Sequence, residues 1–443
     1  MGNSLGEQLP AWMILPFIGL LLCIATLPLA RPEWFDRHHN KALVAAVFGV
    51  PVVAYLVFGF GRAGYDRVLS TANDYVSFII LLAALFTISG GIYLTGNLLG
   101  KPRSNLAFLV VGALLANFIG TTGAAMMVVR PLLRANSERA HTRHVVIFLI
   151  FIVCNLGGLL TPLGDPPLFL GFLNGVSFFW TMRLFPQWLF TLALTLTLFY
   201  FLDTRYYRRE PPSVVRADKA DYVPLGVMGK INFLFLGGVV GAVVLSEPLL
   251  HLGDLFHFPF LREVVMLVMM GLSLRYGPRE ARRLNRFTWG PIREVAIVFA
   301  GIFAAMIPAL AILEARGGQL GLTQPWQFYW SSGALSSFLD NAPTYLTFTS
   351  TAQGYLHLNS VAALMSEHPV GGVTHAPAAF LAAISCGSVM MGANSYIGNA
   401  PNFMVKTIAE EAGVDMPHFF GYMAYSGMIL IPVFLATTLV FFH

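Results

Sequence analysis

The stretch that decides the fold is "GGLLTPLGDPPLF" at residues 157–169, which interrupts a long apolar run. Glycine and proline both weaken a membrane helix, and a charged carboxylate at membrane depth costs roughly 2.5–3.5 kcal/mol. Irregular backbone is tolerated at that depth only where protein or a water-filled cavity satisfies its N–H and C=O groups. The stretch therefore predicts an unwound segment inside a membrane protein, and this segment carries Asp165.

The composition of the whole chain supports a membrane environment. Of the 443 residues, 56% are hydrophobic and 11% are charged, against roughly 45–50% and roughly 25% in soluble domains. A helix needs about 20 apolar residues to cross the hydrocarbon. The apolar runs predict ten crossings, which begin near Trp12, Ala42, Tyr75, Val145, Trp188, Ile231, Glu263, Glu294, Pro377 and Phe419. We expect an all-α polytopic membrane protein.

Two further apolar stretches, 106–128 and 328–350, are broken in the middle by polar residues. These interruptions predict re-entrant helical hairpins that return to the side of the membrane they came from. They do not favour crossings.

Lys and Arg predict the orientation, because positive residues are retained in cytoplasmic loops. If the N-terminus and the C-terminus are both outside, 22 of the 27 Lys and Arg residues fall in predicted cytoplasmic segments. Those segments are 30–41, 94–105, 130–144, 204–230, 275–293 and 400–418. The net charge of +5 then reflects topology. We expect the basic clusters to lie beside the lipid bilayer, and we expect no nucleic acid as a partner.

An internal repeat relates the opening stretch to a second one. "GLLTPLGDPPLF" (158–169) aligns with "GANSYIGNAPNF" (392–403) at an offset of 234, and "NFIGTTGAAMM" (117–127) aligns with "SFLDNAPTYLT" (337–347) at an offset of 220. Two matches in the same order indicate a duplication. Because each half has five predicted crossings, the second copy enters the membrane from the opposite side. Paired interrupted segments in inverted repeats point to a substrate site at the midplane of a secondary transporter.

The repeat also predicts the domain organisation. Residues 1–204 form the first inverted repeat, with hairpin 106–128 and break 158–169. A cytoplasmic linker at 205–230 leads to the second repeat at 231–443, with hairpin 328–350 and break 392–403. The hairpins and breaks are expected to form a transport domain, and the spans near Ala42, Ile231 and Glu263 a scaffold.

The Gly-rich breaks "TPLGDPP" (161–167) and "YIGNAPN" (396–402), each following a polar hairpin, resemble the ion transporter superfamily. This group includes divalent-anion:sodium symporters, arsenite permeases and NhaD-type sodium:proton antiporters. The full chain, including "ATLPLARPEWFDRHHNK" (25–41), most resembles a bacterial branch labelled either sodium:proton antiporter or citrate transporter. We expect a bacterial inner-membrane protein, and the resemblance implies a homodimer with elevator-like motion.

Residue by residue, "TPLGD" (161–165) and "LDNAP" (339–343) resemble the Thr-Pro-x-Gly-Asp break and the Asp-Asn hairpin of the antiporters. The hairpin sequences "GTTG" (120–123) and "DNAPT" (340–344) depart from the Ser-Asn-Thr motif of the symporters. The comparison favours Na⁺/H⁺ antiport, with cation-coupled symport of citrate or another carboxylate as the alternative.

The expected site is built on two carboxylates, Asp165 and Asp340. A buried carboxylate can exchange H⁺ for Na⁺, and hard cations prefer oxygen ligands. Asn341 and Asn399 are expected to complete a Na⁺ site, and no other cofactor is expected. The wider ion or substrate site is expected to include Thr121, Thr122, Thr161, Gly164, Thr344, Asn394, Ser395 and Gly398. The alternative is that the two aspartates only cap broken half-helices.

The remaining titratable groups are expected to be ordinary solvated residues. Glu263 and Glu294 fall at span ends, and His141 and His144 lie in a basic cytoplasmic segment.

Two other classes of protein are weighed against a transporter. An intramembrane aspartic protease would need Tyr-Asp or Gly-x-Gly-Asp contexts, and "PLG" precedes Asp165 while "SFL" precedes Asp340. The chain also lacks His-Glu-x-x-His, Gly-x-Ser-x-Gly and the Walker phosphate loop, so we expect no enzyme. For a channel, paired inverted breaks are less typical than for alternating access.

Overall fold

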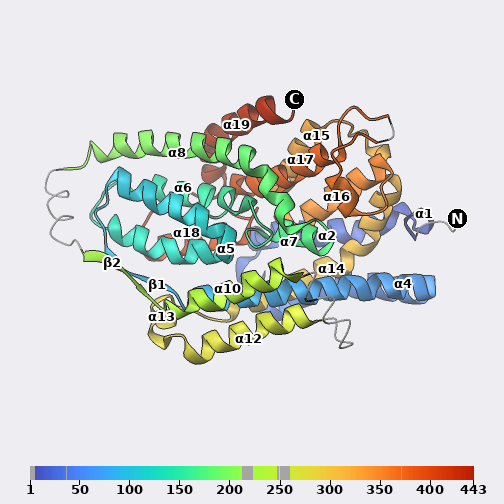
Figure 1. Ribbon diagram of the computed structural model, residues 1–443, viewed down its shortest axis with the longest axis horizontal. Helices are drawn as coiled ribbons and strands as arrows, with labels where there is room; N and C mark the ends of the chain where they lie inside the picture. Colours follow the sequence, from blue (N-terminus) through green and yellow to red (C-terminus); the bar gives the residue numbers. More distant parts are fainter. Residues whose placement is uncertain (1–4, 36, 212–222, 247–248, 250–259, 371) are drawn as a thin grey trace.

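The computed structural model describes the chain except for residues 1–4, 36, 212–222, 247–248, 250–259 and 371 (Figure 1). Its first half contains α1 (Leu5–Gln8), a 3-10 turn (Ala11–Ile14), α2 (Leu15–Ala30), α3 (Pro32–Phe35), α4 (His38–Gly90), β1 (Tyr93–Asn97), α5 (Pro102–Ala135), α6 (Arg143–Ile152), the 3-10 turn η2 (Leu156–Leu159), α7 (Pro166–Leu173), another 3-10 turn (Phe178–Leu184) and α8 (Phe185–Tyr207).

The second half contains β2 (Val223–Met228), α10 (Ile231–Val244), α12 (Leu261–Tyr276), α13 (Arg279–Leu284), α14 (Gly290–Arg316), a 3-10 turn (Gly317–Leu320), α15 (Pro325–Ser336), α16 (Asn341–Leu356), a 3-10 turn (Val361–Met365), α17 (Pro377–Met390), the 3-10 turn η6 (Met391–Asn394), α18 (Ala400–Glu411) and α19 (Phe419–Phe441).

The all-α polytopic membrane class is confirmed. Among the described residues, seven helices are long and apolar enough to cross a membrane. Nine of the ten predicted crossings begin inside a described α-helix, and the first, near Trp12, begins in the 3-10 turn before α2. Two of the ten share α4, and α6, α10 and α12 are short. Helix α5 is one of the seven by length and composition, although the sequence predicts a hairpin there.

The long helix α4 is a hairpin folded at Gly61, whose φ of 54° and ψ of −127° break the helix. Its contacts with α14 show that the chain reverses direction between the two arms. In the first arm, Lys41 pairs with Glu294 at the start of α14. In the second arm, Arg67 lies 2.6 Å from Glu314 at the end of α14, and the Tyr75 hydroxyl donates to the Ala296 carbonyl at 2.8 Å, back near its start. The predicted crossings near Ala42 and Tyr75 are therefore two antiparallel arms.

Helix α5 is also a hairpin, with its tip at Gly120 (φ 75°, ψ 156°). Asn105 and Asn136, near its two ends, exchange side-chain hydrogen bonds of 3.0 and 2.8 Å. The two ends therefore lie together, and the stretch 106–128 folds back as the interruption predicts. Glycine fits the tip because a positive φ is unfavourable for residues with a Cβ.

Helices α15 and α16 form the matching hairpin around residues 337–340, within the predicted stretch 328–350. The rings of Phe328 and Phe348 on the two arms pack edge to face, with centroids 6.4 Å apart.

The six predicted cytoplasmic segments meet at one end of the molecule. Strands β1 and β2 pair antiparallel and join segments 94–105 and 204–230. Arg143 binds Asp415, and Arg286 donates to Glu411 at 2.6 Å, so 130–144 and 275–293 both contact 400–418. Arg139 donates to the Gly100 carbonyl at 3.1 Å. Lys41 reaches Glu294, just past 275–293.

The N-terminal end of the described chain lies at the opposite end of the molecule, and the C-terminal end packs on α15. Arg316, at the far end of α14, donates to the Glu7 carbonyl at 2.9 Å, and Phe442 stacks on Tyr329 with centroids 4.8 Å apart. Helix α14 separates the two ends of the molecule by about 40 Å, at 1.5 Å per residue. Figure 1 shows β1 and β2 on the left and the N-terminus on the right.

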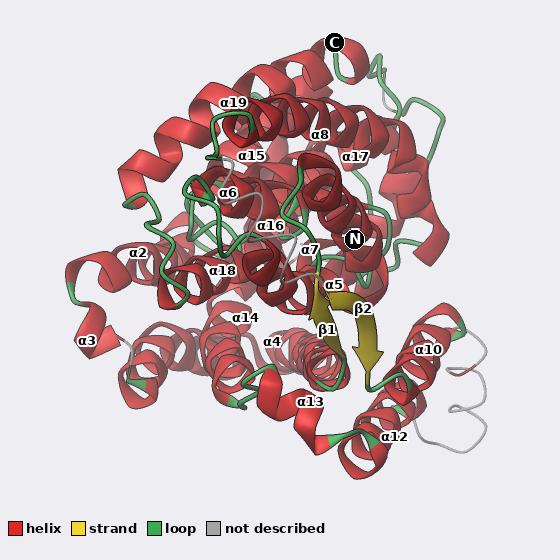
Figure 2. Ribbon diagram, turned by 90° about the vertical axis from the view of Figure 1, so that its left-hand side faces the viewer, coloured by secondary structure: helices red, strands yellow, loops and turns green. Residues whose placement is uncertain are grey.

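The helices fall into two groups in Figures 1 and 2. Helices α4, α10 and α12 contact one another and lie below the group that contains α5, α6, α8 and α15–α19. The three spans predicted as a scaffold are therefore neighbours. The predicted linker 205–230 contains the end of α8 and β2, and its residues 212–222 lie outside the described part of the chain.

Two groups predicted to be solvated are buried. Glu263 is 3% exposed and binds Arg262 and the Ser77 hydroxyl, the latter at 2.7 Å. His144 is 6% exposed, and its Nε2 lies 2.9 Å from Asp203. Both predictions were wrong because a polar partner comes from a different helix, Ser77 for Glu263 and Asp203 for His144, and the position of a residue at a span end does not reveal such a partner.

Candidate functional site

The two predicted breaks are both unwound segments between helices. Between α6 and α7 the chain passes through η2 to Asp165, and between α17 and α18 it passes through η6 to Asn399. Asp165 (φ −143°, ψ 144°) and Asn399 (φ −153°, ψ 138°) are the extended N-cap residues of α7 and α18. Proline follows within the first turn of each helix, where its missing N–H does no harm.

The same close backbone approach occurs in both breaks. A Cβ on Gly164 would lie 2.1 Å from the Gly158 carbonyl oxygen, and one on Gly398 would lie 2.5 Å from that of Gly392. These are the glycines that the 234-residue offset aligns. Each break therefore needs glycine at this position because the chain crosses over itself there.

Each break is bound to the tip of its own hairpin by equivalent hydrogen bonds. Thr161 donates through its hydroxyl to the Asn117 carbonyl, and Ser395 donates to the Ser337 carbonyl. The offsets of 234 and 220 align these two pairs. In the first copy, the Thr121 N–H also donates to the Gly164 carbonyl at 2.8 Å. The hairpin tip and the break thus form one polar unit in each half of the chain.

Asp165 joins the two units. It is 2% exposed, and its Oδ1 accepts hydrogen bonds from the Thr121 hydroxyl at 2.8 Å and from the Asn399 amide at 3.1 Å. Its Oδ2 accepts a hydrogen bond from the Asn341 amide. We call Thr121, Asp165, Asn341 and Asn399 the Asp165 cluster.

The cluster lies where four helical segments begin. Asp165 and Asn399 precede α7 and α18, Asn341 is the first residue of α16, and Thr121 opens the second arm of α5. The partial positive charge of these helix N-termini stabilises negative charge at this point. In the described part of the chain, the side chains bonded to Asp165 are all neutral.

The two aspartates differ in whether their side chains cap a helix. The Asp340 carboxylate accepts a hydrogen bond from the Ala342 N–H at 3.1 Å and so caps α16. The Asp165 side chain makes no capping bond to α7. It binds side chains from other elements, so its position is not explained by capping.

The remaining predicted site residues lie around the cluster. Thr344 donates to the Asp340 carbonyl at 3.0 Å, and Asn394 donates to the Ser337 hydroxyl at 2.9 Å. Thr122 is half-buried beside Thr121. The side-chain oxygens of Asn341 and Asn394 are buried and have no hydrogen-bond partner among the residues that the structure describes, so both are available to a ligand.

Sequence reasoning missed Asn155 and Asn402, which join the two breaks. Both are fully buried, and the Asn155 amide donates to the Asn402 side-chain oxygen at 2.8 Å. Asn402 in turn donates to the carbonyls of Gly392 and Ser395, each at 2.9 Å. The sequence feature that could have identified Asn155 is its amide, a single polar side chain within the apolar run 145–160.

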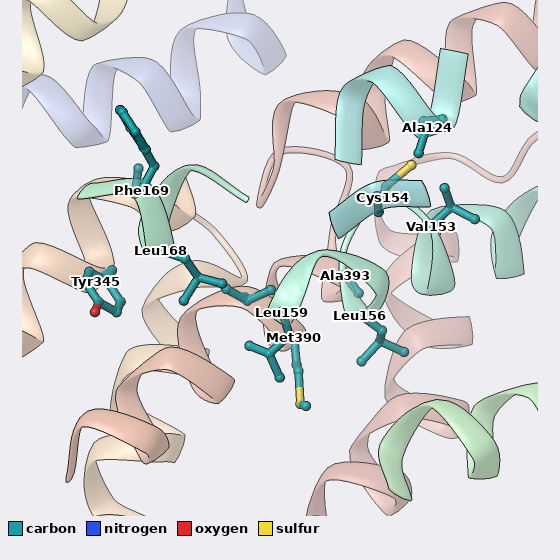
Figure 3. Packing of buried hydrophobic residues seen from close by; sticks show 14 of the residues in the cluster. Ala124, Val153, Cys154, Leu156, Leu159, Leu168, Phe169, Tyr345, Met390 and Ala393 are labelled. Atoms are coloured by element: carbon teal, nitrogen blue, oxygen red, sulfur yellow. The ribbon is translucent and has the colours of Figure 1, made fainter. Parts of the chain in front are cut away.

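Apolar packing holds the two breaks together behind this polar layer. Figure 3 shows Leu156 and Leu159 of η2 near Met390 and Ala393, at the junction of α17 and η6. Helix α17 contacts η2, and these side chains belong to one buried cluster. The breaks are therefore non-helical but tightly packed.

The described residues contain no group of three or more His, Cys, Asp or Glu side chains that could hold a metal ion. A transported Na⁺ would instead be bound by one carboxylate together with amide, hydroxyl and backbone oxygens. Those atom types are the ones that the Asp165 cluster supplies.

Comparison with known protein families identifies the family of this chain. Residues 6–442 match the model of a family described as putative citrate transport. The chain belongs to this family. None of the curated proteins matches it. Membership in the citrate transport family agrees with the citrate-transporter side of the resemblance and makes the protein a multi-pass membrane transporter.

Proposed function

We propose that the protein is a secondary active transporter that moves a citrate-like carboxylate together with a cation through the Asp165 cluster. The observation that carries this proposal is the convergence of four helix N-termini on one buried point. Such N-termini hold carboxylate groups of substrates without Lys or Arg. The family description supports the same substrate class.

The cation is needed for charge balance. Asp165 is itself negative when ionised, and a multivalent carboxylate beside it would be repelled unless a cation lay between them. The unpaired side-chain oxygens of Asn341 and Asn394 and the Asp165 carboxylate are suitable ligands for Na⁺. Loading of the cation would therefore prepare the site for the anion, which couples the two fluxes.

The proposed transport cycle uses two inverted repeats, 1–204 and 231–443. The repeated glycine approaches and hairpin bonds support the duplication. The base of hairpin α5 lies at the end that carries the basic segments, where Asn105 binds Asp203 at 2.9 Å. The second hairpin opens toward the other end, where the space beside Gly317 is filled by Thr351 of α16.

Hairpins entering from opposite sides suit alternating access. We infer an elevator motion of the hairpins and breaks against α4, α10 and α12, in a homodimer in a bacterial inner membrane with both termini outside.

Na⁺/H⁺ antiport is the second candidate, and one observation favours it. The hydrogen-bond partners of Asp165 in the described chain are neutral, so this carboxylate has no fixed counter-ion and could exchange H⁺ for Na⁺. Asp340 stands opposite Gly120 in the repeat alignment and would make the two halves unequal. In this scheme Asp340→Asn flattens the dependence of apparent Na⁺ affinity on pH.

Proteoliposomes separate the two candidates. Labelled citrate uptake and proton movement are measured under the same imposed Na⁺ gradient, with and without citrate. Symport predicts citrate accumulation that requires the cation gradient, and no proton movement without citrate. Proton entry driven by an outward Na⁺ gradient in the absence of any carboxylate would favour antiport. If neither flux exceeds that of empty liposomes, both candidates are wrong.

A further inference from the structure

A polar cavity lies at the end of the molecule that carries the basic segments. It has a volume of about 1070 Å³ and is lined by the second arm of α5, the start of α6, the end of α8, the end of α18 and part of α19. Its cationic lining residues are Arg130, Arg134, Arg139, Arg143 and Arg286. Two acidic residues, Glu411 and Asp415, also line it.

The positive charge of this cavity is only partly compensated. Arg143 pairs with Asp415, and Arg286 pairs with Glu411. Arg139 lies 2.6 Å from Asp203 and 3.9 Å from Glu210, and both of these carboxylates are buried. The guanidinium groups of Arg130 and Arg134 take part in none of these ion pairs.

Among the described residues, no carboxylate is bonded to Arg134 or Arg130. Arg134 donates to two neutral oxygens, the Tyr93 hydroxyl at 2.6 Å and the Leu94 carbonyl at 2.7 Å. The Nε of Arg130 is buried and has no hydrogen-bond partner in the part of the chain that the structure describes. Glu411 attracts Arg130 electrostatically, but its carboxylate is already bonded to Arg286. A buried guanidinium N–H without an acceptor is unfavourable.

We propose that this cavity binds a small multivalent anion that carries carboxylate or phosphate groups, at a site separate from the Asp165 cluster. The planar donor fork of arginine matches both groups, and a polar cavity of this size holds a small molecule. A carboxylate or phosphate oxygen would supply the acceptor that Arg130 lacks. It would also offset the excess charge.

Two helices lead from the Asp165 cluster to this cavity. Arg130 is nine residues past Thr121 on the second arm of α5, about 13 Å along the helix. Glu411 ends α18, which begins next to Asn399. If the anion is the transported carboxylate, the inference rests on the proposed function, and the cavity is a cytoplasmic site that the carboxylate occupies before or after the Asp165 cluster. If the anion is phosphate, the cavity binds an effector.

Binding to the purified full-length protein tests the proposal. Citrate and inorganic phosphate are titrated into the wild-type protein by calorimetry, at low ionic strength and without Na⁺, so that the ionised Asp165 carboxylate repels both anions from the Asp165 cluster. At least one anion is expected to bind. Arg130→Gln should weaken that binding about tenfold, the loss of one charge-assisted hydrogen bond. Glu411→Gln removes a competing carboxylate and should tighten it by roughly three- to tenfold.

The matched control is Arg62→Gln. Arg62 has a 94% exposed side chain and lies beside the Gly61 bend of α4, so its loss should leave binding unchanged. Size-exclusion chromatography checks that each variant is folded. Tight citrate binding with weak phosphate binding identifies the transported carboxylate as the ligand, and the reverse identifies a phosphate effector.

The proposal is overturned if neither anion binds, or if Arg130→Gln and Glu411→Gln leave the affinity unchanged. Because the readout is binding and not transport, this failure is distinct from a failure of the proposed function. If the protein binds phosphate in this cavity but exchanges only Na⁺ and H⁺, the anion site is supported and carboxylate symport is wrong.

Discussion

Asn341 donates a hydrogen bond to Asp165, although the two residues are 176 positions apart in the sequence. The bond joins the tip of the second hairpin to the first break. It makes a single buried site from parts that belong to both halves of the chain. A movement of either hairpin therefore changes the coordination of Asp165, which is what coupling of transport to conformation requires.

Asp165→Asn is expected to reduce coupled transport to the background of empty liposomes. Asn preserves the size of the side chain but cannot ionise, so it cannot balance a cation or carry a proton. The measurement is ion and citrate flux in proteoliposomes, with the elution volume of the variant as the check on folding. The control is Asp66→Asn, since the Asp66 side chain is 62% exposed and should be dispensable. Wild-type flux in Asp165→Asn would remove Asp165 from the mechanism.

Gly164→Ala and Gly398→Ala are each expected to destabilise the protein by a few kcal/mol, because the new Cβ would lie 2.1 or 2.5 Å from a carbonyl oxygen. Thermal unfolding in detergent measures the effect. Gly237→Ala is the matched control, since no described atom outside its own stretch of helix lies within 4 Å of the position that a Cβ would take, and alanine is favoured over glycine inside a helix. Equal stability of all three variants would contradict the crossover geometry.

Asn155→Ala and Asn402→Ala are each expected to cost about 1–3 kcal/mol, the penalty for leaving a buried amide partner unsatisfied. The double variant should be more stable than the sum of the single effects predicts, because the bond between the two residues can be lost only once. A double-mutant cycle on thermal unfolding measures this coupling. Strict additivity would show that the two breaks are not joined through this pair.

The orientation is tested with single cysteines at two exposed positions, after replacement of Cys23, which is partly exposed. Asn359 lies between α16 and α17, and Ser137 lies between α5 and α6. In intact cells, Asn359→Cys should react with an impermeant thiol reagent, and Ser137→Cys should react only after the membrane is permeabilised. The reversed pattern would invert the proposed topology.

The local features of the fold follow from the sequence because they depend on neighbouring residues. A run of apolar residues favours a helix in lipid, and a cluster of Gly and Pro ends one. The breaks at 158–169 and 392–403 and the hairpins at 106–128 and 328–350 are therefore visible in the sequence and occur in the structure. The distribution of Lys and Arg likewise groups segments that the structure brings to one end.

The partners of the buried polar groups do not follow from the sequence in this way. His144 lies in a basic loop segment by sequence and is buried against Asp203. Glu263 begins a span and is bound by Ser77. In each case the burial of a polar group depends on a neighbour supplied by another helix.

By itself, the sequence determined that this chain is a polytopic membrane protein with two hairpins and two breaks, and it predicted that the halves containing them are related by duplication. Hydrophobicity and backbone propensity act locally, so they can be read along the chain. Only the tertiary structure decided that Asp165 is held by Thr121, Asn341 and Asn399, and that Asn155 reaches Asn402. It also decided that the Nε of Arg130 is buried beside a cavity with no hydrogen-bond partner among the described residues. Those contacts depend on how distant helices pack against each other, and helix packing is a property of the whole chain.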